Sequence, residues 1–251
     1  MAKQHGIFKV RGTVGGANFF KTQDGYLVRD ATTLDADRIK NDPAFKRTRE
    51  NGSEFASAAK AGKLFRKAFT SLLVTGSDNR IVSRLVKILV AAQKYDTTHP
   101  RGQRTVMAGN LGLLQGFECN IGAPFEATMK ADFTATIDRA GGKATLAIDS
   151  FIPEALVMAP TGATHFKIVT AAAAIDFDSG VRTTDMQSTA ELPWDIIPTA
   201  AISLINTLPA AGTSPLFLLA GIQFLQKEGN IYYALNTGNA NALQVTKVSL
   251  N

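Results

Sequence analysis

The chain has 251 residues, of which 45% are apolar, so it is long enough to bury a core as one large domain or two small ones, and it does not belong to the disordered class. Its single cysteine, Cys119, excludes an intrachain disulfide, no apolar run reaches the roughly 18 residues of a membrane span, and the start MAKQHGIFKV lacks the apolar stretch of a signal peptide. The lone cysteine fits a reducing compartment, so these features predict a cytoplasmic protein that contacts no membrane.

The N-terminal region, residues 7–30, has the pattern of a β-hairpin or two short strands. Short apolar runs stand on either side of a glycine cluster, and Asp24-Gly25 is a turn signal. A phosphate-binding loop is the alternative interpretation of Gly12, Gly15 and Gly16, but GTVGG lacks the Lys-Ser/Thr pair and the spacing that such loops need. We therefore expect a turn here, followed by a polar linker over residues 31–41.

A long helix is expected from about Pro43 to Leu73. Asp42 and Pro43 form a helix start, since the carboxylate caps a free amide and proline fits the first position. The helix is expected to bend at Asn51-Gly52, where Ser53 would cap a second segment. Apolar residues fall on one stripe at helical spacing: Phe45, Phe55, Ala59, Gly62, Phe65, Phe69 and Leu72. The small residues Gly52, Ala56, Ala59 and Gly62 permit close approach by another helix, although packing on the domain's own sheet is the favoured interpretation.

A second helix is expected over residues 78–95, because Gly76-Ser77-Asp78 stops one helix and caps the next. The segment DTTHPRGQR that follows is a loop, marked by Pro100 and Gly102. A third, shorter helix is expected over 103–115 and would end at Gly116, although Gly109 and Gly112 are unfavourable inside a helix.

Beyond Gly116 the apolar period changes from about 3.6 to 2. Residues 125–138 alternate apolar and polar along their whole length, which predicts a half-buried antiparallel strand, and 139–142 turn it into a partner strand. Gly229-Asn230 is a tight hairpin signal. Further strands are expected over 164–177, 181–191, 200–207, 215–227, 231–236 and 242–250.

The sequence therefore predicts an α+β fold. An N-terminal β-hairpin and two to three helices precede an antiparallel β-sandwich of immunoglobulin-like or jelly-roll type. The composition shift divides the chain into a basic hairpin and helical region, 1–116, and an acidic sandwich, 117–251. In an alternative arrangement the hairpin joins the sandwich and the helices are an insertion between its strands.

The sequence carries no recognised catalytic set. His5, His99 and His165 lack metal-ligand spacing, and Cys119 has no second cysteine near it, so neither a metal nor another cofactor is expected. A nucleophile built from Cys119 with His99 or His165 stays open, because such groups are assembled in space, but an unpaired cysteine is usually a small buried hydrophobe.

Two other segments have a functional and a structural interpretation. Asp176-Phe177-Asp178-Ser179-Gly180 resembles the start of a calcium loop, but it lacks the later acidic ligands, so a strand turn is favoured. Trp194, beside Pro198, would serve either as a partner anchor or as a buried cover for one end of the sandwich. The structural interpretation is favoured for both.

Charge is distributed unevenly along the chain. Residues 1–116 hold 20 Lys and Arg against 9 Asp and Glu, whereas 117–251 hold 7 against 12. This asymmetry indicates an anionic partner or subunits that attract one another. Partner-binding candidates on the basic side are Arg47, Arg49, Lys63, Arg66, Lys67, Arg80 and Arg84. Their candidate acidic counterparts are Asp176, Asp178 and Glu191.

The motifs NDPAFKRTREN, GKLFRKAF and SDNR, with the loop from Asp96 to Arg104, resemble those of an uncharacterised family of Bacteroidetes proteins. The resemblance covers most of the chain. It implies a bacterial source and supplies no catalytic residues.

From these features we expect a non-enzymatic structural protein that assembles with itself into a filament, tube or phage-like particle. The alternative is a protein that binds nucleic acid nonspecifically through its basic helices, with a steep dependence on salt. The aromatics among these charges are expected on the apolar stripe, away from bases. A carbohydrate- or small-ligand-binding sandwich rests on fold analogy alone, and an enzyme ranks last.

Overall fold

The computed structural model describes residues 1–31, 35–235 and 240–250 and divides the chain into two compact units, Met1–Arg49 and Glu50–Asn251. The division therefore falls after Arg49 and not at Gly116, because the helices that follow Arg49 share a hydrophobic core with the sheet. Residues 32–34 of the expected linker and residue 236 of an expected strand lie outside the described residues.

The N-terminal unit is a small antiparallel sheet followed by short helical turns. The expected hairpin is part of a four-stranded sheet of order β1-β4-β3-β2, and Gly25 (φ 109°) makes the turn between β3 and β4. Gly15 and Gly16, both at positive φ, turn β2 into β3, which is the role expected for the glycine cluster. The elements are β1 (Ala2–Lys3), β2 (Gly12–Val14), β3 (Ala17–Thr22), β4 (Gly25–Asp30), α1 (Ala36–Asn41) and η1 (Pro43–Phe45).

Asp42 caps η1 as expected, since its carboxylate accepts the amide of Ala44 and Pro43 opens η1. The linker expected over 31–41 is wrong in its second half, because residues 36–41 form α1, which is capped by Asp35. The bend expected at Asn51-Gly52 is wrong, because α2 (Lys46–Ala68) runs unbroken through both residues. The helix stops instead at Phe69, whose backbone (φ −113°, ψ 22°) leaves the helical range before α3 (Thr70–Gly76) begins.

The second expected helix is α4 (Ile81–Gln93), which buries Ile81, Leu85, Leu89 and Ala92 but leaves Val82 exposed. The third expected helix, 103–115, is wrong except for one 3-10 turn, η2 (Leu111–Leu114). Gly109 explains part of the difference: a Cβ there would meet the backbone of Ala92 and Gln93, so the segment crosses the end of α4 too closely for a helix with side chains.

The C-terminal region forms two antiparallel sheets, so the predicted α+β fold with a sandwich-like arrangement is confirmed. The smaller sheet has the order β10-β6-β5, and the larger has the order β12-β11-β7-β8, with β13 also beside β11 and β9 beside β7. The strands are β5 (Phe133–Asp138), β6 (Lys143–Ile148), β7 (His165–Ile175), β8 (Arg182–Ser188), β9 (Leu192–Pro193), β10 (Ile202–Thr207), β11 (Leu216–Glu228), β12 (Ile231–Ala234) and β13 (Ala242–Ser249).

The strand expected over 125–138 begins only at Phe133. Residues Phe125–Thr128 form one helical turn, α5, which is tied down because the Glu118 carboxylate accepts the amide of Phe125. Another short turn, α6 (Pro153–Leu156), follows β6. The expected hairpins at 139–142 and 229–230 are confirmed, as they join β5 to β6 and β11 to β12.

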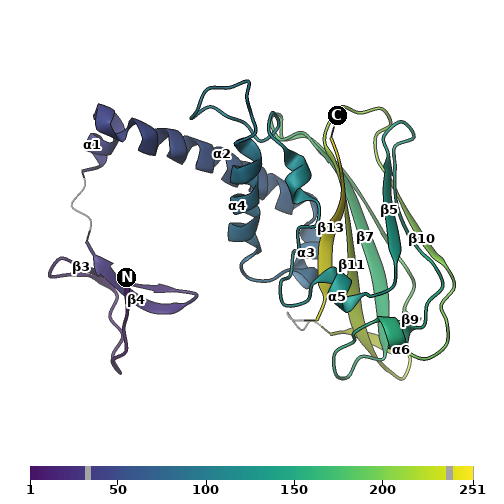
Figure 1. Cartoon of the computed structure of the whole chain (residues 1–251). Helices are drawn as coiled ribbons and strands as arrows, with labels where there is room; N and C mark the ends of the chain where they lie inside the picture. Colours follow the sequence, from purple (N-terminus) through teal and green to yellow (C-terminus); the bar gives the residue numbers. More distant parts are fainter. Residues whose placement is uncertain (32–34, 236–239, 251) are drawn as a thin grey trace. The chain divides into compact units, whose positions relative to one another are not determined.

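The larger sheet is the middle of three layers (Figure 1). Alternate residues of β7, such as Ala171 and Ala173, pack with Phe65 and Leu85 of the helices on one face. Phe166 and Ile168 point to the other face and pack with Leu146 and other residues of the smaller sheet. Because both faces are covered, β7 and β11 are apolar along nearly their whole length.

The helices of the described residues also bear on membrane insertion. None of them combines the length and the apolar character that crossing a bilayer requires.

Candidate partner-binding surfaces

Three lysines form an exposed row on α2, and we call them, together with Arg66, the basic strip. Lys60, Lys63 and Lys67 are spaced at three and four residues, so they lie on one side of the helix, opposite the buried side chains of Ala61 and Phe65. All three lysines are exposed, and Arg66 is partly buried. Helical spacing thus places four cations within two turns.

A hollow lies on each side of this strip. The first, of about 250 Å³, is lined by Lys60, Lys63 and Lys67 and by the turn between β7 and β8, residues 177–180. The second, of about 430 Å³, lies between α2, α3 and α4, and we call it the helical hollow. Its lining residues are Lys63, Arg66, Lys67, Thr70, Leu73, Val74, Ser77, Ile81 and Val82.

The basic strip forms no ion pair with the other described residues. The three lysines take part in no ion pair within 4.0 Å there, and the buried Nε of Arg66 has no hydrogen-bond partner. Asp178 is exposed and lines the first hollow, but it forms no such pair with them either. The strip is therefore a surface at which an external anion would gain interactions without first displacing an internal one.

The other two predicted acidic counterparts are engaged within their own chain. Asp176 closes the turn after β7, since its carboxylate accepts the Ser179 hydroxyl at 2.6 Å and the amides of Ser179 and Asp178 at 3.2 and 2.9 Å. The hydroxyl and these amides lower the pKa of Asp176. The expected strand turn is thus confirmed. Glu191 lies 3.2 Å from Lys167 Nζ.

Arg49 and Arg84 donate hydrogen bonds that hold parts of the fold together. Arg49 donates to the carbonyl oxygens of Ile39 and Asp42 at 2.9 and 2.8 Å within the N-terminal unit. Arg84 donates to Asp78 and to the carbonyl oxygens of Glu118 and Cys119, so it holds α4 against the segment that borders β13. Arg47 and Arg80 are exposed. The structure thus brings together Lys63, Arg66 and Lys67 of the seven basic candidates.

An exposed phenylalanine marks a further hollow that the sequence pattern misassigned. Phe55 belongs to the predicted apolar stripe, but it is 58% exposed, because Glu54 takes the inward position and pairs with Arg104 at 2.8 Å. The hollow beside it has about 780 Å³ and is also lined by Lys94 and Arg101. Because Arg104 lies fifty residues from Glu54 in the sequence, the local pattern around Phe55 does not reveal this ion pair.

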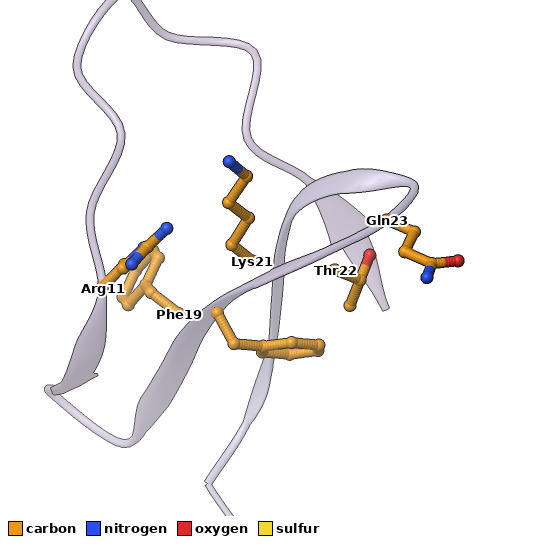
Figure 2. A pocket seen from close by; sticks show the side chains of 6 residues that line it. Arg11, Phe19, Lys21, Thr22 and Gln23 are labelled. Atoms are coloured by element: carbon orange, nitrogen blue, oxygen red, sulfur yellow. The ribbon is translucent and has the colours of Figure 1, made fainter. Parts of the chain in front are cut away.

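The N-terminal unit has a basic and aromatic surface of its own. A hollow of about 700 Å³ is lined by Arg11, Phe19 and Lys21, among others. Figure 2 shows the side chains that line it. Tyr26 receives three cations on its ring, with the charged atoms of Lys9, Arg11 and Lys21 at 6.0, 5.6 and 5.5 Å from the centroid. The Tyr26 ring is therefore packed against cationic side chains and is not part of a hydrophobic core.

The candidate nucleophile Cys119 is unsuited to catalysis. Its side chain is fully buried, and this burial together with the neighbouring Glu118 carboxylate raises the pKa of the thiol far above its ordinary value. His99 Nδ1 lies 2.7 Å from Asp96, and His165 Nδ1 lies 2.9 Å from the Thr164 hydroxyl. Within the described part of the chain, no three His, Cys, Asp or Glu side chains gather in a way that would hold a metal ion.

Trp194 is partly buried and packs against the core between the two sheets. Its Nε1 donates to the carbonyl oxygen of Val157 at 3.0 Å, so the indole holds one end of the sandwich together. The structural role expected for Trp194 is thus supported.

A comparison of the chain with family models, curated proteins and solved structures finds no match.

Proposed function

We propose that the chain is a non-enzymatic structural protein that assembles with copies of itself into a filament, tube or phage-like particle. One observation carries this proposal: the N-terminal unit has strands and aromatic side chains but buries no residue within 1–31 and 35–49. A small sheet without a core is marginal in water, so it gains stability when another surface covers it.

The exposed apolar side chains of this unit support a protein partner. Ile7 and Phe8 are 95% and 88% exposed, and Val14 is 62% exposed. Large apolar side chains of this kind are typical of interaction sites when they occur close together.

Charge indicates which surface would cover the unit. Residues 1–49 hold 10 Lys and Arg against 5 Asp and Glu, whereas residues 117–251 hold 7 against 12. A contact between these regions of two copies would join different surfaces, and a heterologous contact generates rings or open helical polymers.

The test is light scattering with negative-stain microscopy on the full chain, before and after nuclease treatment, at low and high salt. We expect regular particles that resist nuclease and whose mass falls as salt screens the charges. A monomer at all concentrations and salt conditions would contradict the proposal.

A second candidate function is nonspecific binding of nucleic acid, and the Phe55 hollow favours it. An exposed ring beside the exposed Lys94 and Arg101 is an arrangement on which a base would stack while phosphates meet the cations. If this function holds, the particles will break up on nuclease treatment, and Phe55→Ala will weaken binding of a single-stranded oligonucleotide, while Val82→Ala, at an exposed site of α4, will not.

A further inference from the structure

We propose that the loop 194–199 of one copy inserts Ile196 and Ile197 into the helical hollow of the next copy. This inference rests on the proposed function, because it names one contact through which the chain would assemble. The loop and the helical hollow are different surfaces of one molecule, so every copy offers both and each contact leaves one of each free for further copies.

The loop exposes an unusual pair of side chains. Ile196 and Ile197 are 72% and 66% exposed, and the nearby Met158 and Ile152 are 56% and 41% exposed. Four large apolar side chains at one end of the sandwich are unfavourable in water unless a partner covers them.

Hydrogen bonds at both ends hold this loop in place. At its start Trp194 donates to the carbonyl oxygen of Thr164 at 2.9 Å, and the Asp195 carbonyl accepts the amide of Glu154 at 2.9 Å. At its end the amide of Thr199 donates to the carbonyl oxygen of Phe151 at 2.8 Å. A loop fixed in this way loses little conformational entropy when its tip is buried, which favours binding.

The helical hollow matches the tip in chemistry. Its floor is made by the buried Leu73 and Ile81, and its wall includes Val74 and Val82, which are 78% and 44% exposed. Its volume is about 430 Å³. An apolar floor with exposed apolar walls is a surface that gains from receiving an apolar tip.

The charges around the two surfaces are opposite. Residues 149–158 and 191–199 hold four carboxylates and no Lys or Arg: Asp149, Glu154, Asp195 and Glu191, of which Glu191 is paired with Lys167. The rim of the helical hollow carries Lys63, Arg66 and Lys67, which have no ion pair within 4.0 Å among the described residues. The opposite charges favour a second copy of the chain as the partner, because the acidic loop of one copy is attracted to the basic rim of another. Two copies of the same surface would repel each other.

Disulfide trapping between two singly substituted full-length proteins tests this contact. Val74→Cys and Ile197→Cys both replace exposed side chains, so neither is expected to perturb folding, and the native Cys119 is buried and unreactive. We expect mild oxidation of the mixture to give a disulfide-linked heterodimer. Ile205→Cys, at an exposed isoleucine of β10, replaces Ile197→Cys in the control mixture and should give at least about tenfold less product.

A charge exchange provides a second, independent test. Lys67→Glu and Glu154→Lys should each weaken assembly about tenfold through like-charge repulsion, and mixing the two proteins should restore the contact between the altered tip and the altered rim.

The outcomes separate this inference from the proposed function. If the wild-type chain assembles but the trapping yield equals that of the control and the exchange restores nothing, the loop contact is wrong while the proposed function stands. If trapping fails because the wild-type chain is a monomer under all conditions, the proposed function fails as well. The inference would also be overturned if the Val74→Cys protein formed a disulfide with an unrelated acidic protein that carries a surface cysteine as readily as with the Ile197→Cys protein.

Discussion

Asp96 shows how one buried carboxylate organises an irregular segment. Its side chain is fully buried and accepts the amides of Thr98, His99 and Thr105 at 2.9, 3.1 and 2.8 Å, together with the Thr98 hydroxyl at 2.8 Å. Burial alone would raise its pKa, but these hydrogen bonds and the His99 ring outweigh that effect and lower it strongly. The loop between α4 and η2 is therefore built around one ionised group.

We expect Asp96→Ala to lower the free energy of unfolding by about 2–4 kcal/mol at neutral pH, because several buried donors lose their acceptor. The folded-state pKa lies below the unfolded one, so the carboxylate stabilises the fold above about pH 4 and the effect is lost as pH falls further. Chemical denaturation between pH 2 and 7 would show the difference between Asp96→Ala and wild type shrinking in acid.

Asp149→Ala, at an exposed carboxylate, is the matched control and should change stability by less than about 0.5 kcal/mol. A difference between Asp96→Ala and wild type that persists undiminished at pH 2 would contradict the assigned role.

At this scale the sequence indicated the loop but not its organising residue. Pro100 and Gly102 marked DTTHPRGQR as irregular by composition alone. The pairing of Glu54 with Arg104 joins residues fifty positions apart, and in α2 Glu54 is buried whereas Phe55 faces outward. No local periodicity carries that information, since Phe55 fits the apolar stripe by spacing.

The contact between α2 and α4 depends on a missing side chain. A Cβ at Gly62 would lie 3.3 Å from Leu89 Cδ1 and 3.5 Å from Val86 Cγ2, so the glycine allows the two helices to pack closely. The small-residue face of α2 was expected to permit such an approach, and the neighbour it meets here is a helix of the same chain. This contact also orients the helices that border the helical hollow.

Gly62→Val should therefore lower the free energy of unfolding by about 1–3 kcal/mol, since the branched side chain forces the helices apart. Gly52→Ala is the matched control in the same helix, because a Cβ at position 52 meets nothing within 4 Å. We expect Gly52→Ala to be stabilising by about 0.5–1 kcal/mol through helix propensity. Equal effects of both substitutions in thermal denaturation would rule out the packing role of Gly62.

Most helices and strands were predictable because their apolar periods are strong. The exception over residues 125–138 is instructive, since the alternation is perfect in sequence but the strand starts only at Phe133. The Glu118 carboxylate captures the amide of Phe125, and Met129 pairs with Val157. Ala127 is exposed and Thr128 is buried, so the burial of this turn does not follow the alternation that the sequence shows.

The boundary between compact units was not predictable from composition. Charge changes at Gly116, but the helices before it and the sheet after it are packed into one core that includes Phe69, Phe217 and Leu243. Only residues 1–49 form a separate unit. Charge reports on the surface, whereas the division into units follows buried contacts, so the two boundaries need not coincide.

The N-terminal sheet, which has no core of its own, gives a prediction for the whole molecule. If other copies cover it, backbone amides within residues 1–31 should exchange with deuterium more slowly as protein concentration rises, because association buries them. Hydrogen-exchange mass spectrometry over a hundredfold concentration range would measure this protection. Amides of β7 and β11 serve as the internal control, since both strands are covered on both faces at any concentration.

Exchange of the N-terminal amides that is independent of concentration, in a chain shown by light scattering to assemble, would place the assembly contacts elsewhere. High salt should reverse the protection if charge attracts the two regions.

The three-layer arrangement also has a consequence for synthesis on the ribosome. Helices α2 and α4 emerge early, but the sheet residues that cover Phe65 and Leu85 include Phe217 and Val245, which are made more than a hundred residues later. Until those strands are made, the apolar stripes of the two helices stay exposed to solvent, and chaperones have access to them. Chains truncated before β11 should consequently aggregate. Substitutions confined to residues 1–31 should leave the yield of soluble protein unchanged.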